Sequence, residues 1–229
     1  MSRWFTQRTT LSDILQVNYS AILLLPRLGI KLGFGDRSVA EVCQQYGLSS
    51  VFVITMLNCY TFDNYEPDLD SLDNEAMRLL VPYLVRSHTY YAEERIPHIE
   101  RHLQHIASEA GSRYADVLIR FFQDYRADMT THFANEEEHI FPMIEKKLDG
   151  CTIDRSKVSA FAKSHDSMVD KLSDLMQIVF KYLPSEGMLE ELNELLFSIL
   201  QFSFDLKKHA LIEDKIMIPF LTRKEAGKK

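Results

Sequence analysis

The sequence predicts an all-α protein, an up-down-up-down four-helix bundle built from two pseudo-symmetric helical hairpins and preceded by a small helical N-terminal domain. Apolar residues recur with helical spacing over four long stretches, separated by the short segments "EAGSR", "LDGCTIDRS" and "LPSEG". No segment alternates with a period of two for long enough to predict a sheet. Four helices joined by short connections favour a bundle of antiparallel neighbours. The four stretches span residues 74–109, 113–147, 155–183 and 187–224.

A change in composition marks the boundary between the two domains. Six acidic residues and a proline lie in "DNYEPDLDSLDNEA", residues 63–76. This segment is typical of a linker or of the start of a helix, for which Ser71 or Asp73 would supply the N-cap. We therefore expect the N-terminal domain to span residues 1–66 and the bundle to span residues 67–229.

Charge and composition narrow the classes of function. The 229 residues are 46% hydrophobic, which is enough to bury a sizeable core. The net charge is -7, yet residues 1–62 hold five basic residues against three acidic ones, so the acidic excess lies in the bundle. An acidic bundle argues against nucleic acid as a partner.

The location is inferred from signals that the sequence lacks. The N-terminus "MSRWFTQRTTLSDILQ" has no apolar core of signal-peptide type, and the apolar runs "AILLL" and "VFVITML" are too short to cross a membrane. Cys43, Cys59 and Cys151 lie far apart without a C-x-x-C motif, as is typical of a reducing compartment. We expect a cytoplasmic protein without a membrane partner, and the sequence leaves its oligomeric state open.

Two segments of the predicted bundle share one layout. In "THFANEEEHIFPMI", His132 is followed by Glu136 four residues later and then by a proline. The segment "HALIEDKIMIPF" repeats this with His209 and Glu213, at a constant offset of 77 residues. A spacing of four places histidine and glutamate on one face of a helix, one turn apart.

The same offset relates two further histidines on the other two helices. His88 in "VRSHTYY" and His165 in "AKSHDSM" lie 77 residues apart, and each precedes its His-x-x-x-Glu segment by 44 residues. A repeat that keeps chemistry at a fixed offset implies two hairpins that face each other across a pseudo-twofold axis. The six side chains would then converge on one point.

Four imidazoles and two carboxylates are a ligand set for two adjacent metal ions. Burying such groups without a counter-charge would cost several kcal/mol. Each ion would take two histidines, and the glutamates would bridge the ions. Mixed nitrogen and oxygen ligands suit iron, and manganese and zinc stay open. The predicted ligands are His88, His132, Glu136, His165, His209 and Glu213.

Two other residues fall near this face by spacing alone. His139 follows His132 by seven residues, and Tyr125 precedes it by seven. Seven residues are close to two helical turns, so either side chain could contact the ligands from outside. Packing in the core is the alternative for His139.

At these residues the chain resembles the hemerythrin-like (HHE) cation-binding domain, and is most similar to the di-iron proteins for repair of iron centres. The segments "HFANEEEHIFP" and "HALIEDKIMIP" resemble that family's "H-x-x-x-E-x-x-x-x-x-P" segments, and "VRSH" and "KSHDS" supply its other two histidines. The resemblance covers about residues 70–222. It implies an oxo-bridged di-iron centre in a four-helix bundle.

The resemblance implies a protein that binds NO or O2 and repairs iron or iron-sulfur centres under nitrosative or oxidative stress, with damaged iron-sulfur proteins as partners. That family carries adjacent cysteines near its N-terminus, where this chain has "LGFG". Cys43 is the only thiol nearby, and its neighbours favour a buried apolar role. No residue is predicted to be catalytic, because no catalytic triad or phosphate loop is present.

The alternative function is an oxygen-binding or redox-sensing module coupled to the N-terminal domain. "SVAEVCQQYGLSSVFVITMLN" has a helix, a turn at Gly47 and a second helix, as a helix-turn-helix does. The second helix, "SSVFVITML", lacks the Arg, Lys, Asn or Gln side chains that read base edges. This pattern therefore favours DNA binding only weakly.

Overall fold

The computed structural model describes residues 4–110, 113–162, 167–182 and 188–223, and these residues form an all-α protein. Within them the four predicted helical stretches are confirmed, and no strand is present beyond an isolated bridge between Thr10 and Ser38. The chain forms two compact units, of which one joins residues 1–86, 141–162 and 208–229 and the other joins residues 87–140 and 163–207. The expected domain boundary at residue 66 stays a prediction.

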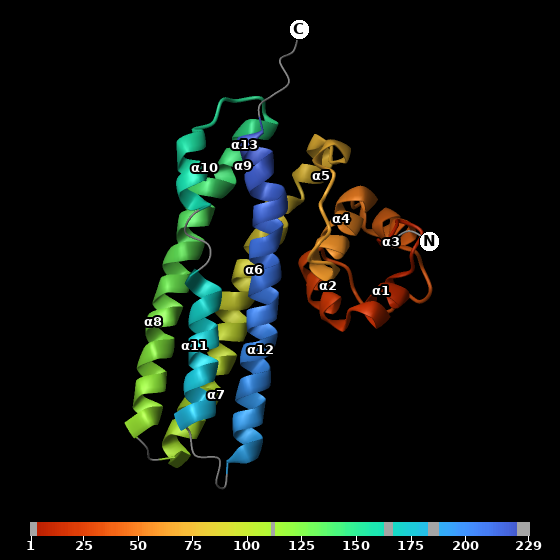
Figure 1. The fold of residues 1–229 in the computed structure, drawn as a ribbon. Coiled ribbons are helices and arrows are strands. Elements are labelled where there is room, and N and C mark those ends of the chain that lie inside the picture. Colours follow the sequence, from red (N-terminus) through yellow and green to blue (C-terminus); the bar gives the residue numbers. More distant parts are fainter. Residues whose placement is uncertain (1–3, 111–112, 163–166, 183–187, 224–229) are drawn as a thin grey trace. The chain divides into compact units, whose positions relative to one another are not determined.

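The second unit is a four-helix bundle. Its helices lie side by side in Figure 1, and each contributes buried apolar side chains to one core. Burying one such side chain stabilises the fold by about 1.5–3 kcal/mol. The core includes Ile99 and Leu103, Phe122 and Met129, Leu172 and Leu175, and Leu195 and Ile199. The helices are α7 (Ile96–Ala110), α8 (Arg113–Asn135), α11 (Ser167–Tyr182) and α12 (Leu189–Ile212).

The first unit contains the N-terminal helices. Ser38 and Glu41 form a capping box at the start of one of them, which ends at Gly47 with a φ of 65°. Glycine adopts this left-handed conformation without steric cost. The elements are α1 (Leu11–Val17), η1 (Tyr19–Leu23), α2 (Leu24–Arg27), α3 (Val39–Tyr46) and α4 (Ser50–Thr61).

Helix α4 is the core of this N-terminal segment. Every residue from Phe52 to Tyr60 is buried, so the helix is covered on all sides. A helix buried all round presents no face to a DNA groove. The structure therefore gives no support to α4 as a recognition helix. Cys43 is buried as expected, and burial raises the pKa of its thiol to about 12.

The rest of the first unit lies in the middle and the C-terminal part of the chain. Asp73, one of the two residues predicted as N-cap, accepts a hydrogen bond from the Ala76 N–H at 2.8 Å and so caps its helix. No helix in the described part of the chain is long and apolar enough to cross a membrane. The elements are η2 (Leu69–Ser71), α5 (Asn74–Met77), α6 (Leu80–Tyr90, of which the part from Ser87 onward belongs to the second unit), α9 (Phe141–Leu148), α10 (Arg155–Phe161) and α13 (Ile218–Thr222).

Three turns in the described helices are wound as π-helix: η3 (Tyr91–Arg95), η4 (Glu136–Ile140) and η5 (Glu213–Met217). Each ends two residues before a proline, and two of them begin at a predicted ligand glutamate. Proline lacks the N–H of a regular helix, and its ring clashes with the carbonyl four residues earlier. A wider turn accommodates the ring without ending the helix. The prolines are Pro97, Pro142 and Pro219.

Candidate metal centre

Glu136 lies between two histidines at the first residue of η4. Its carboxylate is fully buried. One oxygen, Oε2, lies 3.0 Å from Nε2 of His88 on α6. The other, Oε1, lies 3.1 Å from Nε2 of His132 on α8, one helical turn before it. Each carboxylate oxygen therefore faces a different imidazole.

These distances suit ligands that share metal ions. Two atoms each bound at about 2.1 Å to one ion, at roughly a right angle, lie about 3 Å apart. A carboxylate with one imidazole beside each oxygen can contact one ion through each oxygen. Glu136 would thus be able to bind a metal ion through each oxygen, with His88 on one side and His132 on the other.

The ring of His88 is held in one orientation by two neighbours. Its Nδ1 lies 2.8 Å from Oε1 of Glu137, and the ring of Phe133 stacks on it at 4.1 Å between centroids. When Nδ1 carries the proton and donates a hydrogen bond to Glu137, the lone pair of Nε2 points toward Glu136. Metal-binding histidines in proteins are usually oriented by such a carboxylate.

The second histidine–glutamate pair repeats this spacing. Nε2 of His209 on α12 lies 3.1 Å from Oε1 of Glu213, the first residue of η5. Both side chains are buried, with 2% of His209 and none of Glu213 exposed. Two buried polar side chains on one helix face are costly unless a proton, an ion pair or a metal satisfies them.

Four of the predicted ligands form one cluster. Ligand atoms of His88, Glu136, His209 and Glu213 all lie within 4.8 Å of one another, and all four residues are buried. No other such group of three or more His, Cys, Asp or Glu residues occurs in the described part of the chain. Two buried carboxylates carry a charge that divalent ions would neutralise, and imidazole with carboxylate suits iron, manganese or zinc. The donor set therefore fits a metal centre.

The other two predicted ligands have different outcomes. His132 lies outside this group of four but contacts Glu136, and 14% of its side chain is exposed. His165 lies outside the described residues, so its ligand role stays a prediction from the repeat.

The two outer residues predicted by spacing are not placed at the cluster. His139 is exposed, because the π-turn from Glu136 to Ile140 holds more residues per turn and rotates His139 off the face of His132. Tyr125 is buried in the bundle core, and its hydroxyl has no hydrogen-bond partner among the described residues. Burial raises the pKa of this phenol.

Glu137 was missed by sequence reasoning. Adjacent residues on a helix point in different directions, so a neighbour of Glu136 was not expected near the ligands. The signal was present in the repeat, because the residue 77 positions later, Asp214, is also acidic.

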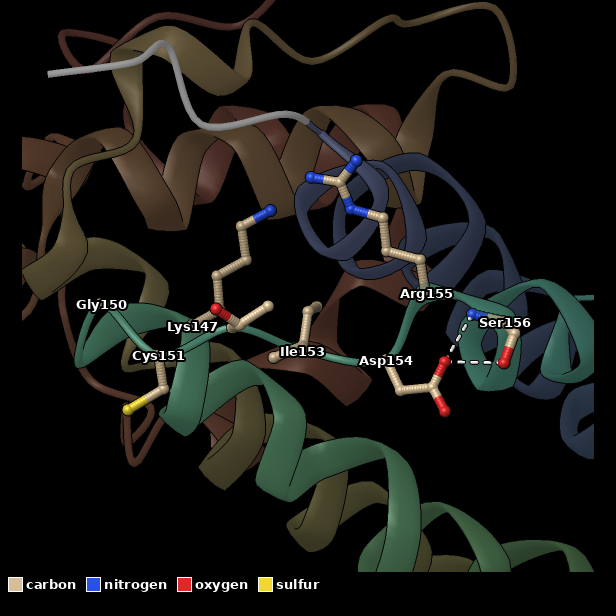
Figure 2. Close-up of a pocket in the computed structure, with 8 residues that line it drawn as sticks. Lys147, Gly150, Cys151, Ile153, Asp154, Arg155 and Ser156 are labelled. Atoms are coloured by element: carbon tan, nitrogen blue, oxygen red, sulfur yellow. Dashed lines mark hydrogen bonds between the residues drawn. The ribbon is translucent and has the colours of Figure 1, made fainter. Parts of the chain in front are cut away.

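A hollow of about 700 Å³ lies away from these ligands, along the loop between α9 and α10 (Figure 2). The ammonium group of Lys147 lines it and donates hydrogen bonds to the carbonyls of Phe220 and Arg223, at 2.6 and 2.7 Å. A lysine at the end of a helix satisfies its last carbonyls and its dipole. Lys147 therefore caps α13, which accounts for its position at this hollow.

One family model matches the chain, and it describes a cation-binding domain. The model of the hemerythrin HHE cation-binding domain matches residues 79–220, which is more than half of the chain. The matched range contains all six predicted ligands. No curated protein and no solved structure is significantly similar to the chain.

Proposed function

Since the chain belongs to the hemerythrin HHE cation-binding family, we propose that its buried cluster holds two metal ions and that iron is the native metal. The observation that carries this proposal is the placement of Glu136, with His88 beside one carboxylate oxygen and His132 beside the other. A site for a single ion would need only one of these oxygens. Manganese and zinc are the alternatives that the donor set allows. The proposed ligands are His88, His132, Glu136, His165, His209 and Glu213.

The protein residues would hold and shield the metal pair. Glu136 and Glu213 would bridge it, and Glu137 would keep the proton of His88 on Nδ1. Phe133 covers one face of the His88 ring, which limits the access of water to that ligand. Iron bound here would supply open positions for a small ligand, since four histidines and two shared carboxylates do not fill two six-coordinate ions.

The function that we propose is binding of NO or O2 and repair of iron or iron-sulfur centres under nitrosative or oxidative stress, with damaged iron-sulfur proteins as partners. The support is the resemblance of the ligand segments to the proteins for repair of iron centres. A cytoplasmic location belongs to the same proposal, and Cys43, Cys59 and Cys151 are free thiols, as a reducing compartment would maintain.

Metal analysis of protein purified without chelator tests the di-metal centre. We expect about two metal ions per chain, mainly iron, because the ligand set serves two sites. Fully loaded protein with one ion per chain would contradict the two-metal proposal. The reduced, loaded protein should also restore activity to an iron-sulfur enzyme damaged by NO.

The second candidate is an oxygen-binding or redox-sensing module. A stable oxygenated spectrum that reverses on removal of oxygen would favour it over repair. Its coupling to DNA is not supported, since α4 is buried. We expect residues 1–62 within the full chain to give no sequence-specific, salt-sensitive binding to duplex DNA.

A further inference from the structure

An acidic strap follows α4 and runs along the helix that carries His209 and Glu213. We define the strap as residues 62–70. Within the first unit, three of its acidic side chains pair with three basic side chains of the C-terminal helical segment. The pairs are Asp63 with Lys208, Glu66 with Lys215 and Asp70 with Arg223.

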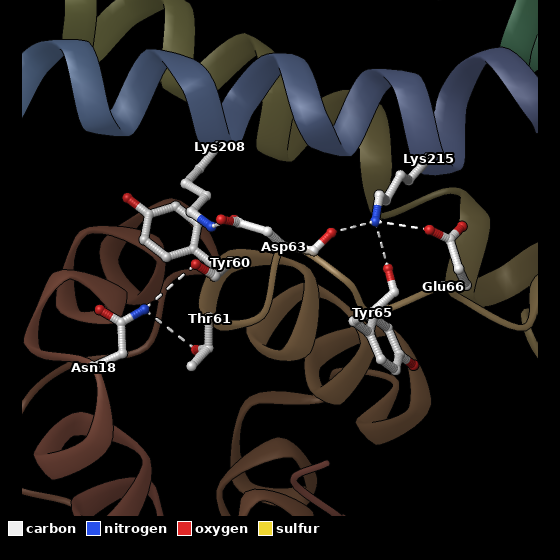
Figure 3. Close-up of polar contacts among 8 residues, drawn as sticks. All are labelled: Asn18, Tyr60, Thr61, Asp63, Tyr65, Glu66, Lys208 and Lys215. Atoms are coloured by element: carbon white, nitrogen blue, oxygen red, sulfur yellow. Dashed lines mark hydrogen bonds and ion pairs between the residues drawn. The ribbon is translucent and has the colours of Figure 1, made fainter. Parts of the chain in front are cut away.

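The first pair lies directly beside a ligand. Lys208 precedes His209, and only 8% of its side chain is exposed. Its ammonium nitrogen lies 2.6 Å from Oδ1 of Asp63 (Figure 3). This hydrogen bond from Lys208 is the main reason that the pKa of Asp63 lies below its usual value. A nearly buried ammonium group needs such a partner, because desolvation of an unpaired charge is costly.

The second contact lies beside the other ligand. Lys215 is the third residue of the π-turn that begins at Glu213. Its ammonium group donates to the carbonyls of Asp63 and Tyr65, both at 2.7 Å, and to the carboxylate of Glu66 at 3.0 Å (Figure 3). The strap therefore contacts the helix at residues on both sides of the His209–Glu213 pair, namely Lys208 and Lys215.

The strap is anchored in turn on the N-terminal residues. Phe62 contacts the rings of Trp4 and Phe5, at 5.2 and 5.0 Å between centroids, and Tyr65 contacts Trp4 at 5.3 Å. The Asn18 amide donates to Tyr60 O and Thr61 Oγ1 at the end of α4, at 3.4 and 3.3 Å (Figure 3). A continuous set of contacts thus joins the first residues of the chain to the ligand helix.

We propose that Asp63 is a positioning residue for the metal centre, and that the strap links metal binding to the docking of the N-terminal residues. The inference rests on the proposed metal centre. Asp63 holds Lys208, Lys215 holds the strap backbone, and together they fix the turns that carry His209 and Glu213. Without the Asp63 charge, Lys208 loses this ion pair, and the adjacent His209 shifts from its ligating position.

The coupling must act in both directions. If the strap stabilises the ligating arrangement, then bound metal stabilises the docked strap to the same degree. Trp4 is the single tryptophan of the chain and packs against Phe62 and Tyr65, so its fluorescence reports the state of the strap.

The first test is the full-length variant Asp63→Asn, which removes the charge and keeps the size. We expect metal release to a chelator to become about tenfold faster, as for other groups that orient ligands, and the absorption spectrum of the iron-loaded protein to change. Asp63→Glu keeps the charge, so its rate of metal release and its absorption spectrum should be close to those of the unmodified protein. Asp70→Asn is the matched control, since its partner Arg223 is exposed and ten residues beyond Glu213. Folded Asp63→Asn protein with unchanged release and spectrum would overturn the inference.

The second test uses the unmodified chain and does not depend on the folding of a variant. Zn²⁺ is added to the metal-free protein while bound zinc and Trp4 fluorescence are both measured. We expect the fluorescence change to saturate together with zinc binding, and chymotrypsin cleavage after Phe62 and Tyr65 to slow. Zinc binding with no change in fluorescence or cleavage would overturn the strap inference alone. A protein that binds neither zinc nor iron would overturn the proposed function, and this inference with it.

Discussion

The two histidine–glutamate segments, residues 132–142 and 209–219, have the same spacing from histidine to glutamate, and each contains a π-turn. They differ in the contacts that hold them in place. In the first segment, Glu137 follows the proposed ligand Glu136 and orients the His88 ring. The Glu137 side chain is 42% exposed. In the second, Lys208 and Lys215 tie the helix to the acidic strap. The repeat therefore extends to the proposed ligands and to the turns that carry them. The supporting contacts differ between the halves, because Glu137 belongs to the first segment itself, whereas the acidic strap that holds the second half lies outside the repeat.

Removing either glutamate should have the largest effect. The 77-residue offset gives Glu136 and Glu213 equivalent positions, so each should contact both ions. We expect Glu136→Ala and Glu213→Ala each to lose both metals and the oxo-bridge absorption. Loss of metal should also remove the stabilisation that binding provides, about 3 kcal/mol at a free metal concentration of 100 times Kd.

Metal analysis and absorption spectroscopy check this prediction, with His88→Ala as the comparison. The histidine variant should weaken the binding of mainly one ion, so its metal content and spectrum should resemble those of neither glutamate variant. Full metal content with an unaltered spectrum in either glutamate variant would remove that residue from the site, and with it the equivalence of the two segments.

The two histidines of these segments should differ in their effect. His209 is buried, so His209→Ala leaves a closed cavity and should lower the free energy of unfolding by about 3 kcal/mol. His132 is partly exposed, so water can fill the space, and His132→Ala should lower it by about 1 kcal/mol. Denaturant unfolding of the metal-free variants, compared with the metal-free unmodified protein, measures both values.

The same difference in access predicts different chemical rescue. Added imidazole should restore metal binding in His132→Ala and fail to do so in His209→Ala. Equal losses and equal rescue would show that the two halves are alike in exposure as well as in spacing.

The sequence predicted the four helices, the bundle and the ligand spacing because these depend on local periodicity and on a repeat within the chain. The π-turns were not predicted, since the apolar period of 3.6 does not reveal a single wider turn. A proline six residues after Tyr91, Glu136 and Glu213 was their signal. The pair of Asp63 and Lys208 joins residues 145 positions apart, and no local pattern encodes such a contact.

Removing the carboxylate that orients His88 should have a smaller effect than removing a ligand. We expect Glu137→Ala to weaken metal binding by about tenfold, because the His88 ring loses its fixed orientation. Glu138→Ala is the matched control, since Glu138 is the next residue and is exposed. Competition with a chelator measures both affinities.

The counterpart of Glu137 sharpens the comparison. Asp214 lies 77 residues later and is exposed, as Glu137 is. An equal loss of affinity in Asp214→Ala would extend the symmetry from the ligands to the carboxylates beside them. No loss in Glu137→Ala itself would mean that its contact with His88 leaves metal binding unaffected.

The smallest effect is expected at a position where the two halves differ by one hydroxyl. Tyr125 in the first half corresponds to Phe202 in the second, 77 residues later, and both rings are buried in the bundle core, 6.4 Å apart between centroids. The Tyr125 hydroxyl has no hydrogen-bond partner among the described residues, and an unsatisfied buried hydroxyl costs free energy. Tyr125→Phe makes the two halves alike and should raise the free energy of unfolding by about 1 kcal/mol.

Metal content and the absorption spectrum of Tyr125→Phe should equal those of the unmodified protein, because the phenol contacts Phe122 and Phe202 in the core and no described ligand. Phe202→Tyr is the reciprocal change, and it should destabilise the bundle because it buries a second hydroxyl where a phenyl ring packs. Opposite signs for the two variants would establish that the hydroxyl is a local cost in the core. A shifted spectrum or lost metal in Tyr125→Phe would instead bring the hydroxyl to the metal centre and make the first half functionally distinct from the second.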